Sequence, residues 1–232
     1  MTEHRKVATT QSTKSADKVL DAVQKQGRAV RRVGVFSGTF DPVHKGHISF
    51  ALQAIVAAGL DTVVFVPEPR PRHKHDVTHQ SHRIAMIKLA IMAYPKLGLL
   101  ELPDKQFTVG TSLPRLIQKY PDAQLLMLIG TDVLSHISVW PNTRQLLKKV
   151  GLVVAVRGQK DERQAFNMMA RLPAEPPESH VLVSNFKQVS SRTIRDAIKA
   201  GDTPDGMLAT VNAYATEHWI YHSLGSAKKL SL

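Results

Sequence analysis

Two histidines, His44 and His47, stand three residues apart just after a glycine-rich turn, and they are the clearest candidates for chemistry in this chain. Residues at this spacing in the first turn of a helix project from one face. A helix start also offers unpaired backbone N–H groups and the positive end of the helix dipole, both of which bind phosphate. The pair is therefore predicted to donate hydrogen bonds to a polyphosphate, at oxygens that gain negative charge during group transfer.

Two glycines in the same stretch fit this interpretation. Gly38 lets the backbone come close to a ligand at the end of a strand, and Gly46 keeps the space between the histidines open for a nucleotide. The alternative is an ordinary turn at Asp41-Pro42, followed by a helix that merely begins with histidines. The length of the whole pattern, from Gly38 to His47, favours the functional interpretation.

The stretch resembles the HxGH signature of the nucleotidyltransferase superfamily, whose members transfer a nucleoside monophosphate from a nucleoside triphosphate to a phosphate-bearing acceptor. The resemblance implies that His44 and His47 are catalytic. It also implies contacts to ATP from residues of the same turn, namely Gly38, Thr39, Phe40 and Gly46. It identifies the class of reaction but not the acceptor.

A second candidate site lies at residues 189–195, which precede and open a predicted helix. Ser190 or Ser191 is a natural N-cap, and Arg195, one turn later, can reach a phosphate. Alone, this would be an ordinary capped helix with a surface arginine. Beside the histidine motif it resembles the superfamily's second signature, Ile-Ser-Ser-Thr-x-Ile-Arg, which implies that the two serines bind ATP and that Arg195 is catalytic. Arg192 stands where the signature has threonine.

The elements that must position these motifs alternate between short apolar runs and helical patterns. The runs at 125–129 and 152–156 are almost continuously hydrophobic, which indicates parallel strands covered on both faces. Gly59 and Gly201 stand where helices are expected to end. The alternation predicts an α/β fold with a doubly wound, mostly parallel sheet, of the Rossmann-like kind, in which ligands bind beyond the carboxyl ends of the strands. The expected strands are 33–37, 62–66, 98–102, 124–129, 151–156 and 180–183, and the expected helices are 46–58, 81–93, 111–119, 143–149, 161–171, 191–200 and 208–222.

Segments between the two signatures narrow the resemblance to the nicotinate-nucleotide adenylyltransferase family. They are 72–74, 83–86, 107–113, 129–132, Trp140 and 153–157, and the whole resemblance covers about residues 33–222. It implies that Gly130 and Asp132 contact the nucleotide of ATP. It further implies an acceptor site in which Trp140 stacks on the pyridine ring and Thr108 lies near the carboxylate, with Lys74 and Arg157 also contacting the acceptor.

Two observations leave parts of this acceptor site open. Trp140 is equally consistent with packing in the core. Pro141 has no N–H, whereas the family uses a backbone N–H just after this aromatic residue to hold the nicotinate carboxylate. A missing hydrogen bond to a charged group is worth about 1.5–3 kcal/mol, so the sequence does not decide between the acid and amide forms of the acceptor.

The loop after the second expected strand is rich in histidine. Its metal-ligating side chains are His73, His75, Asp76, His79 and His82. Their spacing matches no common zinc pattern, so we expect no protein-bound metal here. A cationic loop that closes over ATP, with Arg70, Arg72 and Lys74, is the better interpretation.

The composition is that of one globular enzyme domain. The chain has 232 residues, 43% hydrophobic content and no cysteine, which excludes disulfides and thiolate zinc sites. It has no apolar run of the roughly 20 residues needed to span a bilayer, and no signal peptide. We expect a cytoplasmic protein with a basic, flexible or partly helical extension at 1–30, a nucleotidyltransferase domain at 31–223 and a tail at 224–232. The net charge of +12 lies largely at the termini without interleaved aromatic residues, so we expect no nucleic-acid partner.

The expected reaction is transfer of AMP from ATP to nicotinate mononucleotide, giving nicotinate adenine dinucleotide and pyrophosphate. Mg²⁺ is expected to bind through the ATP phosphates, and the protein is expected to act by positioning and electrostatic stabilisation. The alternatives are a related transferase that uses nicotinamide mononucleotide, pantetheine phosphate or CTP, and a non-catalytic nucleotide- or nucleic-acid-binding protein on the same fold. The sequence leaves open whether the chain forms a homo-oligomer.

Overall fold

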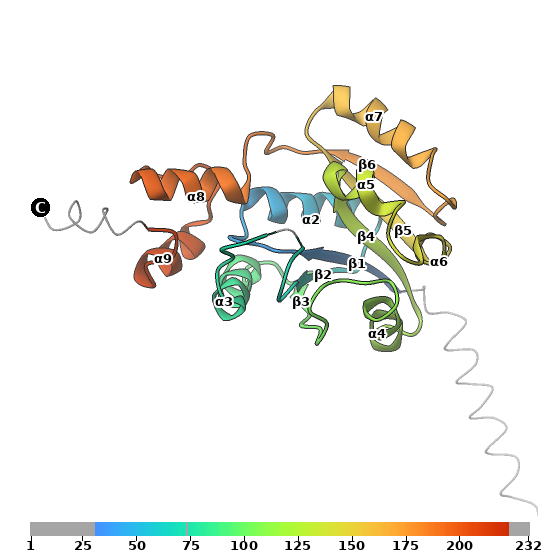
Figure 1. The fold of residues 1–232 in the computed structure, drawn as a ribbon, viewed down its shortest axis with the longest axis horizontal. Coiled ribbons are helices and arrows are strands. Elements are labelled where there is room, and N and C mark those ends of the chain that lie inside the picture. The colour runs from blue at the N-terminus through green and yellow to red at the C-terminus, as the bar shows by residue number, and fades with distance from the viewer. Residues whose placement is uncertain (1–30, 73, 223–232) are drawn as a thin grey trace, which may run out of the picture. The chain divides into compact units, whose positions relative to one another are not determined.

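A six-stranded parallel sheet organises residues 31–72 and 74–222, which are the residues that the computed structural model describes (Figure 1). The strands lie in the order β3-β2-β1-β4-β5-β6. Their bounds are Arg31–Gly38 (β1), Thr62–Pro67 (β2), Leu97–Leu99 (β3), Ala123–Gly130 (β4), Val150–Val156 (β5) and Ser179–Val183 (β6). The helices are Lys45–Ala57 (α2), Gln80–Ile91 (α3), Ser112–Lys119 (α4), Thr131–Ile137 (α5), Thr143–Leu147 (α6), Gln159–Met169 (α7), Ser191–Ala200 (α8) and Ala209–Glu217 (α9).

The strand order places a topological switch point between β1 and β4. From β1 the chain winds outward through β2 to β3, and from β4 it winds outward through β5 to β6. The carboxyl ends of the two central strands, at Gly38 and Gly130, therefore lie beside the crevice where sheets of this kind bind ligands. The predicted doubly wound, parallel α/β fold is confirmed.

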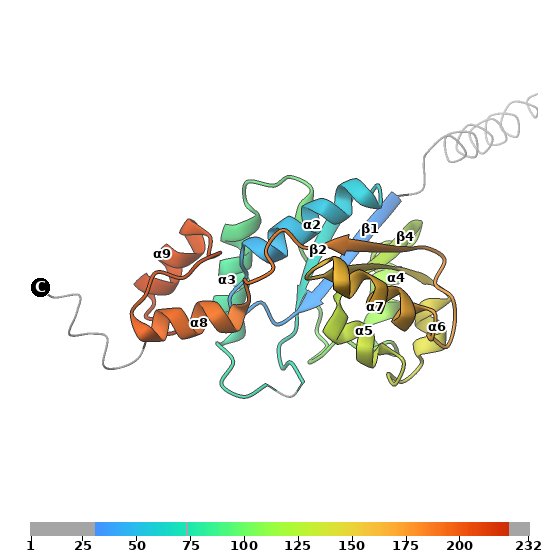
Figure 2. The same ribbon diagram turned by 90° about the horizontal axis from the view of Figure 1, so that it is seen from above.

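Alternate residues of the central strands enter two separate hydrophobic cores. Phe36, Phe65 and Leu128 belong to the core that also contains residues of α2, α3, α8 and α9. Val35 and Ile129 belong to the other core, which is formed with α4, α5, α6 and α7. In both views α8 and α9 lie near α3 on one side, and α4 to α7 lie on the other side (Figures 1 and 2). The near-continuous apolar strands are thus explained by burial on both faces.

Most expected elements are present, and the differences have local causes. Helix α5 was not expected, because it follows β4 directly with Gly130 as its N-cap and no polar loop between them. Helix α9 ends at Glu217, before the expected limit of 222, since Trp219 and Tyr221 have positive φ angles of 51° and 71°. Gly201 ends α8 with φ +82°, as predicted.

The predicted extensions at 1–30 and 224–232 lie outside the described residues, and the predicted domain limits stay predictions. Over residues 31–72 and 74–222, none of the helices combines the length and apolar character needed to span a membrane.

Candidate active site

The first turn of α2 fixes the orientation of both signature histidines. His44 is the N-cap residue, with extended backbone, and its N–H donates to Nδ1 of His47 at 3.2 Å. The N–H of His47 donates in turn to the His44 carbonyl at 2.9 Å. Because Nδ1 of His47 accepts a hydrogen bond, the proton of the neutral ring resides on Nε2. The fold therefore presents Nε2–H of His47 as a donor.

The two imidazole rings stack on each other and are held neutral. Their centroids are 3.6 Å apart with an interplanar angle of 27°, and His44 is only 6% exposed. Burial lowers the pKa of His44 to about 4. Burial, followed by the neighbouring His44 and Lys74, lowers the pKa of His47 well below its ordinary value. Near neutral pH both rings are therefore uncharged hydrogen-bond donors.

The Nδ1 atom of His44 is a buried polar atom of this pair. Among the residues that the structure describes, no group hydrogen bonds to the buried Nδ1 of His44. Such atoms are rare in folded proteins and are normally satisfied by water or a ligand. The observation fits a bound group at the start of α2.

The glycines of the motif make room for its aromatic rings. A Cβ on Gly46 would lie 3.0 Å from the His44 ring, and a Cβ on Gly38 would lie 3.1 Å from Phe40. Phe40 is 2% exposed and packs edge-on against His47, with ring centroids 5.1 Å apart. The Phe40 side chain is thus part of the core that supports His47, and only its backbone is available for the predicted contact with ATP.

The fold brings the second signature onto the first. Ser191 Oγ donates to the Pro42 carbonyl at 2.9 Å, and Arg195 Nη1 donates to the Asp41 carbonyl at 2.7 Å. Ser190 is the N-cap of α8, and its hydroxyl accepts from the Thr193 N–H at 3.1 Å. The starts of α2 and α8 therefore converge, as a site for a polyphosphate requires.

The residue after the substituted position in the second signature takes part in capping α8. Thr193 Oγ1 accepts from the N–H of Ser190 at 3.0 Å, which completes a reciprocal capping box. Arg192 is exposed. The capping box of α8 is thus formed by Ser190 and Thr193.

A buried carboxylate holds the Asp41-Pro42 turn of the first signature, a role that the sequence did not indicate beyond a turn-forming Asp-Pro pair. Asp41 is 4% exposed. Tyr221 donates its hydroxyl to Asp41 Oδ1 at 2.6 Å, and the Thr78 N–H donates to Oδ2 at 3.2 Å. Burial and the adjacent Asp41 raise the pKa of Tyr221. Tyr221, which follows α9, thus helps to shape the Asp41-Pro42 turn.

A buried arginine ties the histidine-rich loop to the same turn. Arg83, in α3, is 1% exposed, and its guanidinium donates to the carbonyls of Thr39 at 2.7 Å, Thr78 at 2.8 Å and Pro69 at 3.2 Å. Burial lowers the pKa of Arg83, while the nearby Asp41 acts in the opposite direction. The loop is therefore anchored near both of its ends.

Lys74 lies beside the turn of the first signature. Its Nζ donates to Thr39 Oγ1 at 2.9 Å, and its charge reaches His47. The histidines of the same loop separate into other contacts: His79 pairs with Ser81, and His82 with Tyr214. Within residues 31–72 and 74–222, no three His, Cys, Asp or Glu side chains are grouped to hold a metal ion. His73 lies outside the described residues.

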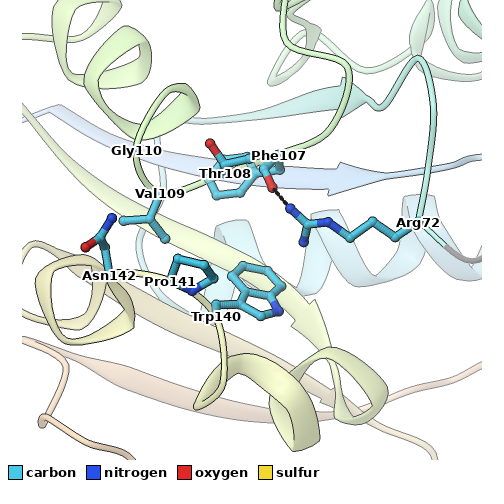
Figure 3. A pocket seen from close by; sticks show the side chains of 8 residues that line it. All are labelled: Arg72, Phe107, Thr108, Val109, Gly110, Trp140, Pro141 and Asn142. Carbon is cyan, nitrogen blue, oxygen red and sulfur yellow. Dashed lines mark hydrogen bonds between the residues drawn. The ribbon is translucent and has the colours of Figure 1, made fainter.

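Trp140 and Thr108 line the same pocket (Figure 3), and the acceptor roles that the resemblance implies for them stay predictions. Its volume of about 190 Å³ is below the roughly 300–1,000 Å³ of drug-sized sites, so it suits one ring of a nucleotide. Trp140 is half-buried, with Phe107 packed beside it at 6.4 Å between ring centroids. The residues that line the pocket are Arg72, Phe107, Thr108, Val109, Gly110, Trp140, Pro141 and Asn142.

The ends of the next strands carry the remaining predicted residues. Gly130 caps α5, and a Cβ there would lie 2.4 Å from Asp132 Oδ1, so the carboxylate folds back over the end of β4. Asp132 is exposed. Arg157 is also exposed, directly after β5, and is not among the residues that line the Trp140 pocket. Their roles in binding stay predictions.

Comparison with known proteins decides the family. Residues 35–197 match the family model described as cytidylyltransferase-like. The nicotinate-nucleotide adenylyltransferase of Bacillus subtilis (strain 168) is 33% identical over 204 residues, which are 84% of this chain and all of the relative. The chain belongs to the nicotinate-nucleotide adenylyltransferase family. A probable nicotinate-nucleotide adenylyltransferase from Bordetella pertussis is 31% identical over 83% of this chain and 98% of the relative. The resemblance inferred from the sequence motifs is confirmed.

Solved structures of the family share the fold. The nicotinic acid mononucleotide adenylyltransferase of Plasmodium falciparum, solved in complex with NaAD, superposes with a TM-score of 0.68 at 15% identity, over 82% of this chain and 97% of the other. A putative nicotinate-nucleotide adenylyltransferase from Vibrio parahaemolyticus gives a TM-score of 0.58 at 16% identity, over 82% and 95% of the two chains. At these identities the likeness shows the Rossmann-like fold alone.

Proposed function

We propose that this protein transfers AMP from ATP to nicotinate mononucleotide, giving nicotinate adenine dinucleotide and pyrophosphate. The observation that carries the proposal is the convergence of the two signatures, through Ser191 on the Pro42 carbonyl and Arg195 on the Asp41 carbonyl. The names of the relatives, nicotinate-nucleotide adenylyltransferases that match over most of this chain, support the choice of acceptor.

The phosphate site and the ring pocket are neighbours at the carboxyl edge of the sheet. The N–H of Glu68 donates to the carbonyl of Gly38, the last residue of β1, at 2.9 Å. Glu68 Oε1 accepts from the N–H of Phe107, which lines the ring pocket, at 3.1 Å. One residue therefore links the two parts, and a nucleotide acceptor can place its ring in one and its phosphate near the other.

In this reaction a phosphate oxygen of the acceptor attacks the α-phosphorus of ATP, and the bond to the bridging oxygen of pyrophosphate breaks. His47 donates through Nε2–H to an α-phosphate oxygen as negative charge develops there, with the stacked His44 beside it. The start of α8 and Arg195 neutralise the departing pyrophosphate. The contribution of the protein is positioning and charge stabilisation, with no covalent intermediate.

We propose Mg²⁺ as the metal of the reaction, held by the phosphates of ATP. Both carboxylate oxygens of Asp41 already accept hydrogen bonds, and the described residues contain no cluster of three metal-ligating side chains. This donor set fits an ion that keeps its waters and takes most of its other ligands from the triphosphate. When bound, Mg²⁺ neutralises part of the phosphate charge.

Pyrophosphate release from ATP and Mg²⁺ tests the proposal, with nicotinate mononucleotide, nicotinamide mononucleotide and pantetheine phosphate as separate acceptors. We expect release with nicotinate mononucleotide, together with formation of the dinucleotide. Release with pantetheine phosphate alone would replace the proposed acceptor. No release with any acceptor would overturn the proposed activity.

A further inference from the structure

The pocket around Trp140 contains one ionisable side chain among its described lining residues, that of Arg72. We infer that Arg72 recognises the carboxylate on the acceptor's pyridine ring and so sets the preference for the acid over the amide nucleotide. The inference rests on the proposed function and assigns the discriminating group within it. On sequence grounds Arg72 was expected on the loop that covers ATP, and the structure places its side chain at the ring pocket instead.

Hydrogen bonds between two loops bring Arg72 to this position. Glu68 accepts from the Phe107 N–H, and the N–H of Arg70 donates to the Lys105 carbonyl at 2.9 Å. Residues 68–72 are thereby fastened along residues 105–107. The placement of Arg72 thus follows from loop pairing that involves residues more than 30 positions apart in sequence.

The guanidinium is oriented by two further hydrogen bonds. Arg72 Nε donates to Gln106 Oε1 at 2.9 Å, and Nη2 donates to the Phe107 carbonyl at 3.0 Å. Figure 3 shows the side chain reaching the pocket from one side, with its guanidinium directed to the backbone at Phe107, close to the indole of Trp140. The guanidinium has five N–H groups, so these two bonds leave three for a ligand.

The distance to the stacking surface suits a substituent of a bound ring. The guanidinium carbon of Arg72 lies 5.9 Å from the centroid of the Trp140 ring, at the outer limit of a cation–π contact. A ring that binds at the indole therefore lies close to a positive charge. A ring carboxylate can accept charge-assisted hydrogen bonds from the guanidinium. A carboxamide carries no charge, and an NH2 donor group replaces one of the two acceptor oxygens.

Pro141 makes the charge more important. The residue after Trp140 has no N–H to offer a carboxylate, and Pro141 and Asn142 form the opposite part of the same pocket wall. A pocket without that donor needs another group to favour the acid over the amide. Arg72 supplies a stronger interaction than the neutral N–H that is missing.

The experiment compares kcat/KM for nicotinate mononucleotide and for nicotinamide mononucleotide in the wild-type protein and in the Arg72→Gln, Arg72→Lys and Arg70→Gln variants. Arg72→Gln keeps a polar side chain but removes its charge. It is expected to lower kcat/KM for the acid about ten- to hundredfold, with little change for the amide. Arg72→Lys is expected to restore part of the acid preference. Arg70→Gln removes the same charge two positions away and should leave the ratio between acceptors unchanged.

A binding measurement supplies a readout apart from turnover. The chain has two tryptophans, so in a Trp219→Phe background the fluorescence reports Trp140 alone. Titration of this protein with nicotinate mononucleotide should give a dissociation constant that rises about ten- to hundredfold with Arg72→Gln, while that for the amide stays nearly constant.

The outcomes separate the inference from the proposed function. A wild-type protein that forms no dinucleotide from either acceptor refutes the proposed function and the inference with it. If the wild type is active and Arg72→Gln lowers kcat/KM equally for both acceptors, the inference alone is refuted, because Arg72 then only supports the loop. An unchanged ratio in Arg72→Gln refutes it in the same way.

Discussion

Around the Asp41-Pro42 turn, buried or half-buried side chains bind backbone carbonyls, whereas half of the residues that line the Trp140 pocket are exposed. Arg83 and Arg195 donate to carbonyls of Thr39 and Asp41, and the turn is closed by Asp41 itself. Arg72, Gly110 and Pro141, in the ring pocket, are exposed. From this difference we expect the transfer step to depend on the preassembled turn, and the choice of acceptor to depend on the loops that line the pocket.

The strongest test of this comparison is removal of His47. His47→Ala should lower kcat about 10²–10³-fold with a nearly unchanged KM for the acceptor, because it deletes a donor used as charge develops on the transferred phosphate. Steady-state kinetics with a circular-dichroism check of folding measures this. The control is His82→Ala, which removes an imidazole in α3 that is hydrogen-bonded to Tyr214 in α9. Wild-type turnover in His47→Ala would remove His47 from the mechanism.

The pH dependence of the free energy of unfolding tests whether burial holds the His44 ring neutral. The pKa of His44 is about 4 in the folded protein and about 6.5 when exposed, so the unfolded chain binds more protons between these values. The contribution of His44 to the free energy of unfolding is complete above pH 6.5. It is lost as the pH falls toward 4, by at most about 3 kcal/mol. Urea unfolding from pH 7.5 to 4 should show a smaller loss for His44→Asn than for wild type. The exposed-loop variant His75→Asn should follow wild type; a His44→Asn curve parallel to wild type would contradict the expectation.

Tyr221→Phe examines the support of the turn from the C-terminal side. Without the hydroxyl, Asp41 Oδ1 loses a buried donor, which should lower the free energy of unfolding by about 1–3 kcal/mol and also lower kcat. Urea denaturation and steady-state rates measure both. Tyr214→Phe removes a hydroxyl bonded to His82 and should leave kcat unchanged. Equal kcat values in wild type and Tyr221→Phe would show that Asp41 keeps the turn in place without this contact.

The ring pocket should respond in KM and not in kcat. Trp140→Leu is expected to raise the KM for nicotinate mononucleotide about tenfold through loss of aromatic stacking, with kcat within a few-fold of wild type. Acceptor titrations at saturating ATP distinguish the two parameters. A large fall in kcat at constant KM would mean that the pocket also positions the reacting phosphate, and the contrast between the two regions would then disappear.

Local patterns predicted much of the fold and the family. Continuous apolar runs such as 125–129 and 152–156 indicated strands buried on both faces, and both cores are present. Helix α5 was missed, because seven residues without a polar loop before them give no periodic signal distinct from the preceding strand. The signatures identified the family, since the residue types of a helix start determine which groups can face a phosphate.

The sequence by itself determined which groups meet at the start of each helix: two imidazoles three residues apart at α2, and Ser190, Ser191 and Arg195 at α8. Such groups depend only on helical geometry, which is local. Tertiary structure alone decided that α8 closes on the Asp41-Pro42 turn, that Tyr221 holds Asp41, and that Arg72 belongs to the ring pocket. These contacts join residues from about 30 to 180 positions apart, and they form because the strand order and two hydrophobic cores place those segments together. No local pattern of residues carries that information.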